Sequence, residues 1–267
     1  MHERERHGII LSAVQERPVA TVAELVQLTG TSEATIRRDI NTLHTEKKLR
    51  RVRGGAEALA PAALPGLAGR PFALNQTLNT AEKQAIAQAA VALCEDGDAI
   101  IVNGGTTTFQ MVHALAHRRC QVFTNSFPIA THLLKHSKNT VMVPGGAIYR
   151  EQNIILSPFE NDVTRNFYAR RMFMGAQGVG PLGLMEADPL LIRAEEKLMG
   201  QADELVVLVD SSKFEQRSSL VLCPLGRITT LITDDGISDK AAAMLDAADV
   251  KLIVAQSGGA QEGMTAS

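Results

Sequence analysis

The sequence IVNGGTTTF at residues 101–109 decides which class of fold we expect. An apolar run ends at Val102, and Asn103, two glycines and three threonines follow before a helix-like segment begins. A strand that leads through glycines into a helix brings free backbone N–H groups and the positive end of the helix dipole to one point. The stretch therefore predicts a βα unit whose turn binds an anion, either to transform it or only to sense it.

The same alternation of helix and strand continues along the chain. Helix-like segments separate short apolar runs, which lie at 98–102, 121–124, 140–143, 171–175, 205–210, 230–233 and 250–254. Short apolar strands between helices are typical of the mostly parallel sheet of an α/β domain. Ligands of such sheets bind beyond the carboxyl ends of the strands.

Four of those strand ends carry polar residues that suit a phosphorylated small molecule. Glycines let the backbone approach an anion, hydroxyls donate hydrogen bonds, and a lysine supplies charge. The candidates are Asn103, Gly105, Thr106, Thr107, Thr124, Asn125, Ser126, Gly145, Gly146, Asp210, Ser211 and Lys213. Helix capping by Thr and Ser is the alternative explanation for some of them. The 103–108 turn lacks the glycine signatures of mononucleotide and dinucleotide sites, and we expect no cofactor.

Residues 1–56 differ from the rest of the chain in charge. They contain 10 Lys and Arg against 7 Asp and Glu, a net charge of +3. The whole chain has a net charge of -2, so the remaining 211 residues carry -5. A basic head on an acidic body indicates two separate functions.

Helical periodicity in this basic segment predicts a helix-turn-helix. Thr21 and Glu24 form a capping-box pattern, Gly30 marks a tight turn, and a third helix begins after Thr31 or Ser32. In that helix Ile36, Ile40 and Leu43 form an apolar stripe, which leaves a polar face for base edges and phosphates. The candidate DNA contacts of this helix are Ser32, Thr35, Arg37, Arg38 and Asn41.

A basic hairpin follows the third helix. Five basic residues lie within 47–53, and Gly54-Gly55 suits a hairpin turn, so the segment predicts a wing directed at the DNA backbone. Arg50, Arg51 and Arg53 are its candidate contacts. The alternative is a protein-docking module whose charges are only solvated, but helices and wing together favour DNA.

The remaining features define the expected domain organisation. We expect a winged helix-turn-helix domain at 1–56, an Ala-, Pro- and Gly-rich linker at 57–80, a ligand-binding domain at 81–256 and a disordered tail at 257–267. The charged N-terminus and the lack of a long apolar run predict a cytoplasmic protein without a membrane partner. Three scattered cysteines predict reduced thiols.

With these residues in view, the chain resembles the DeoR family of bacterial transcriptional regulators over residues 3–255. The N-terminal match is Thr35-Ile36-Arg37-Arg38-Asp39, followed by LRRVRGGA at 49–56. Matching pieces of the second domain are Glu82-Lys83, the 103–108 turn, Thr124-Asn125, Gly145-Gly146, Gly183-Leu184, Asp188 and 210–214. The resemblance implies a sensor domain related in fold to ribose-5-phosphate isomerase. It also implies an operator-binding repressor that forms a dimer or tetramer and responds to a phosphorylated sugar.

Two departures from the family pattern bear on the sugar. Many members carry Asp where this chain has Asn103, which indicates a different pattern of recognised hydroxyls. Many carry Glu-Ala-x-x-Lys-Arg where this chain reads LLIRAEEKLM at 190–199, a stretch similar to the branch that regulates ascorbate and rhamnose use. On this resemblance Glu195 contacts sugar hydroxyls, and Lys197 or Lys213 contacts the phosphate.

Two other functions compete with this interpretation. A sugar-phosphate isomerase needs a carboxylate base, for which Glu195, Asp188 and Asp210 are candidates, but the acidic Asp-Gly-Ala-Asp-Glu segment of such enzymes is absent. Metal sensing could use the helical pairs His113/His117 and His132/His136, yet neither pair has a third ligand nearby in the sequence. We therefore expect neither catalysis nor a metal site.

Overall fold

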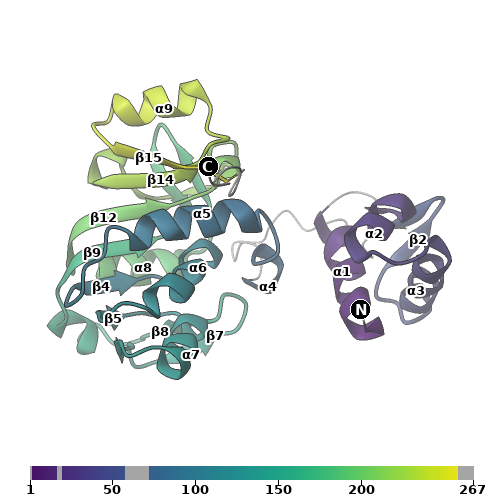
Figure 1. The fold of residues 1–267 in the computed structure, drawn as a ribbon, viewed down its shortest axis with the longest axis horizontal. Coiled ribbons are helices and arrows are strands. Elements are labelled where there is room, and N and C mark those ends of the chain that lie inside the picture. The colour runs from purple at the N-terminus through teal and green to yellow at the C-terminus, as the bar shows by residue number, and fades with distance from the viewer. Residues whose placement is uncertain (1, 17–19, 58–71, 258–267) are drawn as a thin grey trace, which may run out of the picture. The chain divides into compact units, whose positions relative to one another are not determined.

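The computed structural model describes residues 2–16, 20–57 and 72–257, and the chain divides into two compact units at Gly66 (Figure 1). Each unit buries an apolar core of its own. No helix within these described ranges is long and apolar enough to cross a membrane. The predicted combination of a helix-turn-helix with a parallel α/β domain is confirmed.

The described part of the N-terminal unit contains three helices, namely α1 (Glu3–Glu16), α2 (Val22–Thr29) and α3 (Glu33–Thr45). The predicted capping box is present, because Thr21 and Glu24 satisfy each other's backbone N–H groups at 2.9 and 3.3 Å. Gly30 ends α2 with φ 62°, and the Ser32 side chain caps α3. The predicted apolar stripe of α3 is fully buried.

A small antiparallel sheet completes this unit. It has the order β1-β3-β2 and consists of β1 (Ala20–Thr21), β2 (Arg50–Val52) and β3 (Gly55–Glu57). Strands β2 and β3 are the two arms of the predicted wing. A side chain at Gly55 would collide with the carbonyl oxygen of Ala20, so glycine is needed for β3 to pair with β1.

The second unit is built on a parallel sheet of seven strands. Its order is β15-β14-β12-β9-β4-β5-β6, which places β4 (Ala99–Val102) inside the sheet between β9 (Ala169–Met174) and β5 (Gln121–Phe123). The other strands are β6 (Thr140–Met142), β12 (Ala202–Leu208), β14 (Thr230–Asp234) and β15 (Lys251–Ala255).

Helices cover both faces of this sheet (Figure 1). One face packs against α5 (Thr80–Val91), α6 (Thr106–Leu115) and α7 (Phe127–His136). The other packs against α8 (Pro189–Met199) and α9 (Asp239–Asp246). Because every strand is parallel, all carboxyl ends meet at one edge, as expected for a ligand-binding sheet.

Short elements that the sequence analysis did not predict surround that edge. A hairpin joins β7 (Ala147–Tyr149) to β8 (Ile154–Leu156), and a second small sheet contains β10 (Gly178–Gly180), β11 (Gly183–Glu186) and β13 (Leu220–Cys223). Three 3-10 turns, η1 (Val163–Asn166), η2 (Ser211–Phe214) and η3 (Leu225–Arg227), complete the unit.

At the edges of the expected linker, the described residues form secondary structure of the two units. Glu57 belongs to β3, and α4 (Phe72–Asn75) packs on the second unit. Phe72 is 6% exposed, and its ring contacts that of Phe109 edge to face at 5.9 Å. An aromatic partner thus draws this segment onto the domain although its composition resembles a linker. The rest of the linker and residues 258–267 lie outside the described residues.

Candidate functional site

Most of the predicted DNA contacts of the N-terminal unit are exposed. Arg37, Arg38 and Asn41 are exposed on α3, and Arg50, Arg51 and Arg53 are exposed on the wing. Arg51 Nη1 donates to Asn41 Oδ1 at 2.6 Å, which holds the wing against the helix. Arg37 pairs with Glu33 and Arg50 pairs with Glu57. Among the described residues, Arg38 and Arg53 have no ion-pair partner.

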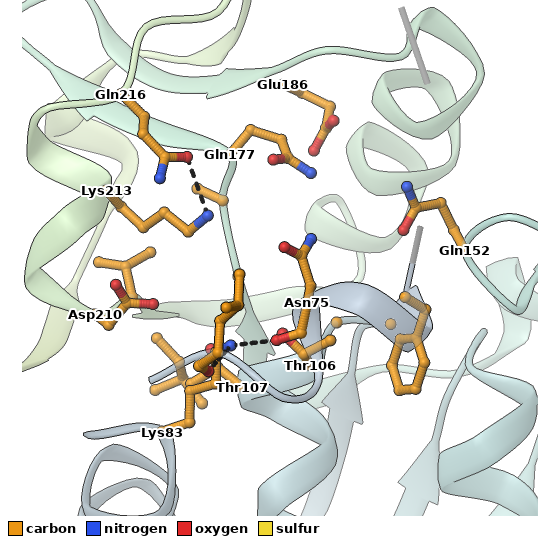
Figure 2. A pocket seen from close by; sticks show the side chains of 18 of the residues that line it. Asn75, Lys83, Thr106, Thr107, Gln152, Gln177, Glu186, Asp210, Lys213 and Gln216 are labelled. Atoms are coloured by element: carbon orange, nitrogen blue, oxygen red, sulfur yellow. Dashed lines mark hydrogen bonds between the residues drawn. The ribbon is translucent and has the colours of Figure 1, made fainter. Parts of the chain in front are cut away.

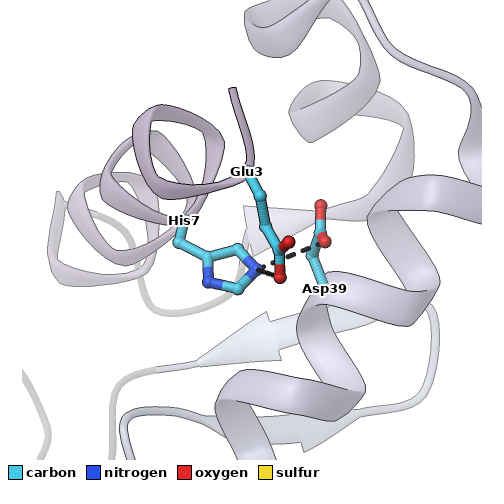
Figure 3. Close-up of side chains that lie close together, drawn as sticks. All are labelled: Glu3, His7 and Asp39. Carbon is cyan, nitrogen blue, oxygen red and sulfur yellow. Dashed lines mark hydrogen bonds and ion pairs between the residues drawn. The ribbon is translucent and has the colours of Figure 1, made fainter. Parts of the chain in front are cut away.

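A buried carboxylate on the side of α3 that faces α1 holds the two helices together (Figure 3). Asp39 is 3% exposed and accepts hydrogen bonds from Arg6 and His7 of α1, with 3.2 Å between Asp39 Oδ1 and His7 Nε2. Burial opposes ionisation of Asp39, but the hydrogen bonds from Arg6 and His7 outweigh it and lower the pKa of the carboxyl. This contact sets the orientation of the exposed face of α3.

Glu3, His7 and Asp39 also lie close enough together to suggest a cation site (Figure 3). The Arg6 guanidinium already occupies both oxygens of Asp39. Glu3 is exposed and lies 3.8 Å from His7. We interpret the cluster as a structural tie between α1 and α3.

In the second unit, a cavity of about 300 Å³ lies at the carboxyl ends of β4, β9 and β12 (Figure 2). The residues that follow these three strands line it, together with α4 and the turn after it, α8, η2 and Gln152 of the β7–β8 hairpin. Figure 2 shows Asp210 and Lys213 on one side of this cavity, and Gln152 on the opposite side. We call it the edge cavity.

The amino end of α6 supplies an anion-binding corner of the edge cavity. Gly105 occupies the N-cap position without a side-chain cap, so backbone N–H groups of the first turn face the cavity beside Thr106 and Thr107. Lys213 of η2 lines the same cavity. Asp210 accepts hydrogen bonds from Ser212 and from Asn79 Nδ2, the latter at 2.9 Å, and so organises η2.

Two buried carboxyl groups also line the edge cavity. Glu186 and Glu195 are each 5% exposed and line the cavity. Burial raises the pKa of both, and the charges of Glu186 and Asp188 raise that of Glu195 further. Asn103 Nδ2 donates to Glu195 Oε1 at 2.8 Å. Polar groups suited to hydroxyls thus share the cavity with a corner suited to an anion.

A buried lysine closes the edge cavity next to α4. Lys83 is 3% exposed, and its Nζ donates to the carbonyl oxygens of Asn75 and Leu78 at 2.6 and 2.5 Å. Burial lowers the pKa of Lys83 to about 8, although Asp210 acts in the opposite direction. Lys83 therefore titrates near physiological pH beside the anion corner.

Comparison with known proteins decides the family. The model of the DeoR-like helix-turn-helix domain matches residues 6–62, and that of the DeoR C terminal sensor domain matches residues 78–235. The chain belongs to the DeoR family. It is 34% identical to the HTH-type transcriptional regulator UlaR of Shigella dysenteriae serotype 1 (strain Sd197) and of Escherichia coli (strain K12 / DH10B). Each match covers 95% of this chain and 99% of the relative.

Solved structures resemble parts of this DeoR-family protein. Ribose 5-phosphate isomerase A from Methanocaldococcus jannaschii has a TM-score of 0.38 and 21% identity, and the match covers 49% of this chain and 53% of that one. The delta subunit of eIF2B from Chaetomium thermophilum has a TM-score of 0.39 and 16% identity, covering 55% and 52%.

The family match confirms the predicted resemblance and the predicted class of function. This DeoR-family chain is a DNA-binding transcriptional regulator with a sensor domain, and not an isomerase. Gly175, Ala176 and Gln177, which follow β9, line the edge cavity and carry no carboxylate.

Of the effector-binding residues predicted from sequence, six line the edge cavity: Gly105, Thr106, Thr107, Glu195, Asp210 and Lys213. Five other predicted residues do not line the edge cavity, because their side chains or backbone N–H groups are engaged in hydrogen bonds or helix caps. Asn103 bonds Glu195, Thr124 Oγ1 donates to the Val102 carbonyl at 2.6 Å, and the Ser211 N–H donates to Asp234 at 2.6 Å. Ser126 and Asp188 cap α7 and α8. Helix capping was the alternative explanation for the Thr and Ser candidates, and it accounts for Ser126.

The remaining four predicted residues lie elsewhere. Gly145 and Gly146 form the turn before β7, where the backbone of Gly146 approaches the Leu156 carbonyl too closely for a side chain. Asn125 and Lys197 line a second cavity, which lies on the other side of α8. These four therefore do not contribute side chains to the edge cavity.

Several polar residues that line the edge cavity were not among the predicted effector contacts: Asn75, Asn79, Gln152, Gln177, Glu186, Ser212 and Gln216. Lys83 was noted only through the family resemblance. Asn75 and Asn79 fell in the expected linker, and Glu186 lies in a strand that was not predicted. Only Ser212, directly before Lys213, lay in a stretch already recognised as polar.

The histidine pairs do not form the arrangement that metal sensing would use. The rings of His113, His132 and His136 lie next to one another: the first two are edge to face with centroids 5.1 Å apart, and the last two are tilted with centroids 4.8 Å apart. Phe109 packs edge to face against His113 and His132. His117 is not among these ring contacts of the described residues. Within the described ranges, Glu3, His7 and Asp39 are the only residues whose ligand atoms cluster closely enough for a metal.

Proposed function

We propose that this regulator is a repressor of a carbohydrate operon and that a phosphorylated sugar in the edge cavity controls its affinity for DNA. One observation carries the proposal. The uncapped start of α6 and Lys213 share a cavity with two buried carboxyl groups, so a ligand with an anionic end and a hydroxyl-bearing end would satisfy both.

The proposed orientation follows from these charges. The phosphate would lie at Gly105, Thr106 and Thr107, with Lys213 beside it, and the sugar hydroxyls would face Glu186 and Glu195. Stretch 190–199 supports a sugar of the ascorbate or rhamnose type through its resemblance to that branch of the family. A protein with these roles would act in the cytoplasm.

The proposed DNA contacts are Arg38 and its neighbours on α3 for bases, and the wing arginines for phosphates. One helix-turn-helix reads one half-site, so we propose a homodimer or homotetramer that binds paired half-sites of double-stranded DNA.

A thermal-shift screen of the full-length protein against sugar phosphates and the same sugars without phosphate tests the effector. A ligand at 100 times its Kd stabilises the folded state by about 2.7 kcal/mol. We expect a shift for a phosphorylated sugar and a much smaller one for its unphosphorylated partner. Equal shifts for both, or none across the screen, would refute the proposed phosphate corner.

Two variants separate the two activities, with DNA fragments selected from a random pool by the wild-type protein. Arg38→Ala should abolish the specific mobility shift at physiological salt and leave the sugar-phosphate shift intact. Lys213→Ala should weaken the effector response and leave DNA affinity unchanged. The opposite pattern for either variant would contradict its assignment.

A further inference from the structure

The second cavity has a volume of about 630 Å³ and shares no lining residue with the edge cavity. Helix α8 separates the two, since Leu191 and Glu195 face the edge cavity whereas Arg193, Ala194 and Lys197 face the second. The opposite wall of the second cavity comes from β8 and from residues 157–165. We call it the α8 cavity.

A buried amide at the wall of the α8 cavity has an unused donor. Asn125 is 1% exposed, and its Oδ1 accepts a hydrogen bond from the Gly104 N–H at 2.8 Å. That bond fixes the orientation of the amide, because the Gly104 N–H requires an oxygen. Asn125 Nδ2 then has no partner, and an unpaired buried donor costs about 1–3 kcal/mol. A ligand that accepts a hydrogen bond would remove this cost.

The lining of the α8 cavity carries a net positive charge, because Arg165, Arg193 and Lys197 outnumber Glu160 and Asp162. Arg165 and Arg193 are exposed, line the cavity and have no ion-pair partner among the described residues. Lys197 is already committed, since its Nζ lies 2.7 Å from Asp162 Oδ2 and donates to the Phe159 carbonyl at 3.0 Å. That ion pair also neutralises Asp162. The two guanidinium groups are therefore available for a carboxylate, sulfonate or phosphate.

Apolar side chains form most of the remaining wall. Ile155 and Leu198 are buried there, whereas Phe159 and Leu190 are 66% and 56% exposed at the rim. Large exposed apolar side chains around a cavity mark a surface that a ligand covers. The wall thus suits an apolar or aromatic body attached to the anionic group.

We propose that the α8 cavity is a second ligand site, for an organic anion with an apolar or aromatic body. The anionic group binds Arg165 and Arg193, an acceptor atom of the ligand receives the Asn125 Nδ2 donor, and the body lies against Phe159 and Leu190. The site is independent of the proposed sugar-phosphate function, because the two cavities share no lining residue.

The probe for this test is 1-anilinonaphthalene-8-sulfonate, an aromatic anion whose fluorescence rises in apolar surroundings. Titrated into the full-length protein, it should bind saturably with one site per chain. Arg165→Glu/Arg193→Glu should weaken this binding at least about tenfold, because two attractive charges become repulsive. Ala194→Trp should abolish it by filling the cavity.

Controls keep the outcome specific. Arg118→Glu changes an exposed arginine outside the cavity and should bind the probe like the wild type, as should Lys213→Ala. Circular dichroism identifies any variant that fails to fold; if Ala194→Trp does so, the double arginine variant decides. The proposed site would be refuted if the folded double arginine variant bound the probe with wild-type affinity. It would also be refuted if a variant lost the probe only because its oligomeric state had changed.

Discussion

At the scale of single residues, Asn103 and Glu195 contain two oxygens that lack hydrogen-bond donors. Asn103 Oδ1 and Glu195 Oε2 have no partner, although the two side chains are already joined through Asn103 Nδ2 and Glu195 Oε1. A proton on Glu195 would supply the donor that Asn103 Oδ1 lacks. We therefore infer that Glu195 is a neutral acid when the edge cavity is empty, which agrees with its raised pKa.

Glu195→Gln tests this inference through the pH dependence of stability. The folded-state pKa of Glu195 lies above its unfolded value, so the folded protein binds more protons and wild-type stability falls as pH rises above about 4.3. The glutamine variant lacks this loss. We expect it to match or exceed wild-type stability at pH 8, with the difference shifting in favour of the wild type toward pH 5.

Urea unfolding at both pH values measures this difference. Glu196→Gln, on the exposed side of α8, is the matched control and should leave the pH dependence unchanged. A Glu195→Gln variant that tracks the wild type at every pH would show that Glu195 is already ionised.

The lowered pKa of Lys83 predicts that effector binding is coupled to proton uptake. Its pKa of about 8 means that it is only partly charged at pH 8. A phosphate nearby favours the charged form and raises that pKa, so Lys83 should take up a fraction of a proton on binding at pH 8 and almost none at pH 6, where the phosphate, with a second pKa of about 6, exchanges protons of its own. Calorimetry in buffers of different ionisation enthalpy measures this uptake.

Lys83→Met supplies the comparison for that measurement. We expect the variant to bind the sugar phosphate more weakly and without the uptake at pH 8. An unchanged uptake would place the titrating group elsewhere.

At the scale of elements, Gly55 determines whether strand β3 of the wing can pair with β1. Any side chain there meets the Ala20 carbonyl, so Gly55→Ala should separate β3 from β1 and displace the wing arginines. We expect DNA affinity to fall by at least about tenfold, because phosphate contacts are lost, while the sensor domain keeps its melting temperature.

Gly54 provides the contrast in the same turn. It has φ 84°, no atom lies within 4 Å of the place that a Cβ would take, and Asn tolerates this backbone conformation. Gly54→Asn should therefore retain DNA affinity in a filter-binding assay. Equal affinity of Gly55→Ala and the wild type would show that the wing does not contribute.

Periodicity predicted some elements well and others not at all. The stripe of Ile36, Ile40 and Leu43 identified α3, because local spacing alone defines an amphipathic helix. It could not identify α4, which depends on Phe72 meeting Phe109 and on Lys83 meeting two carbonyls of the preceding turn. The edge cavity lies at the carboxyl ends of the strands, where the sequence placed its candidate ligand contacts, but its Asn79–Asp210 contact joins residues 131 apart and has no local signal.

At the scale of the whole molecule, the two units have separate cores. We expect two calorimetric transitions, of which a sugar phosphate raises only the one from the larger unit. At 100 times its Kd, a stabilisation of about 2.7 kcal/mol corresponds to roughly 5–10 °C for a domain of this size. Operator DNA should raise only the other transition.

Separately expressed units identify the transitions. A fragment ending at Gly66 should reproduce the DNA-sensitive transition, and a fragment beginning at Leu67 the ligand-sensitive one. A single transition that moves as a whole with either ligand would mean that the units unfold together.

The three cysteines lie only in the larger unit, and they are distributed between its two layers. Cys94 and Cys120 are buried under α5–α7, whereas Cys223 is buried on the opposite face of the sheet. Burial raises the pKa of Cys94 to about 12 and that of Cys223 to about 11, so the reactive thiolate is scarce until a layer opens. The alkylation rates of Cys94 and Cys120 therefore measure how often one layer opens, and the rate of Cys223 measures how often the other does. Mild oxidants should leave these thiols unmodified while the sensor domain stays folded.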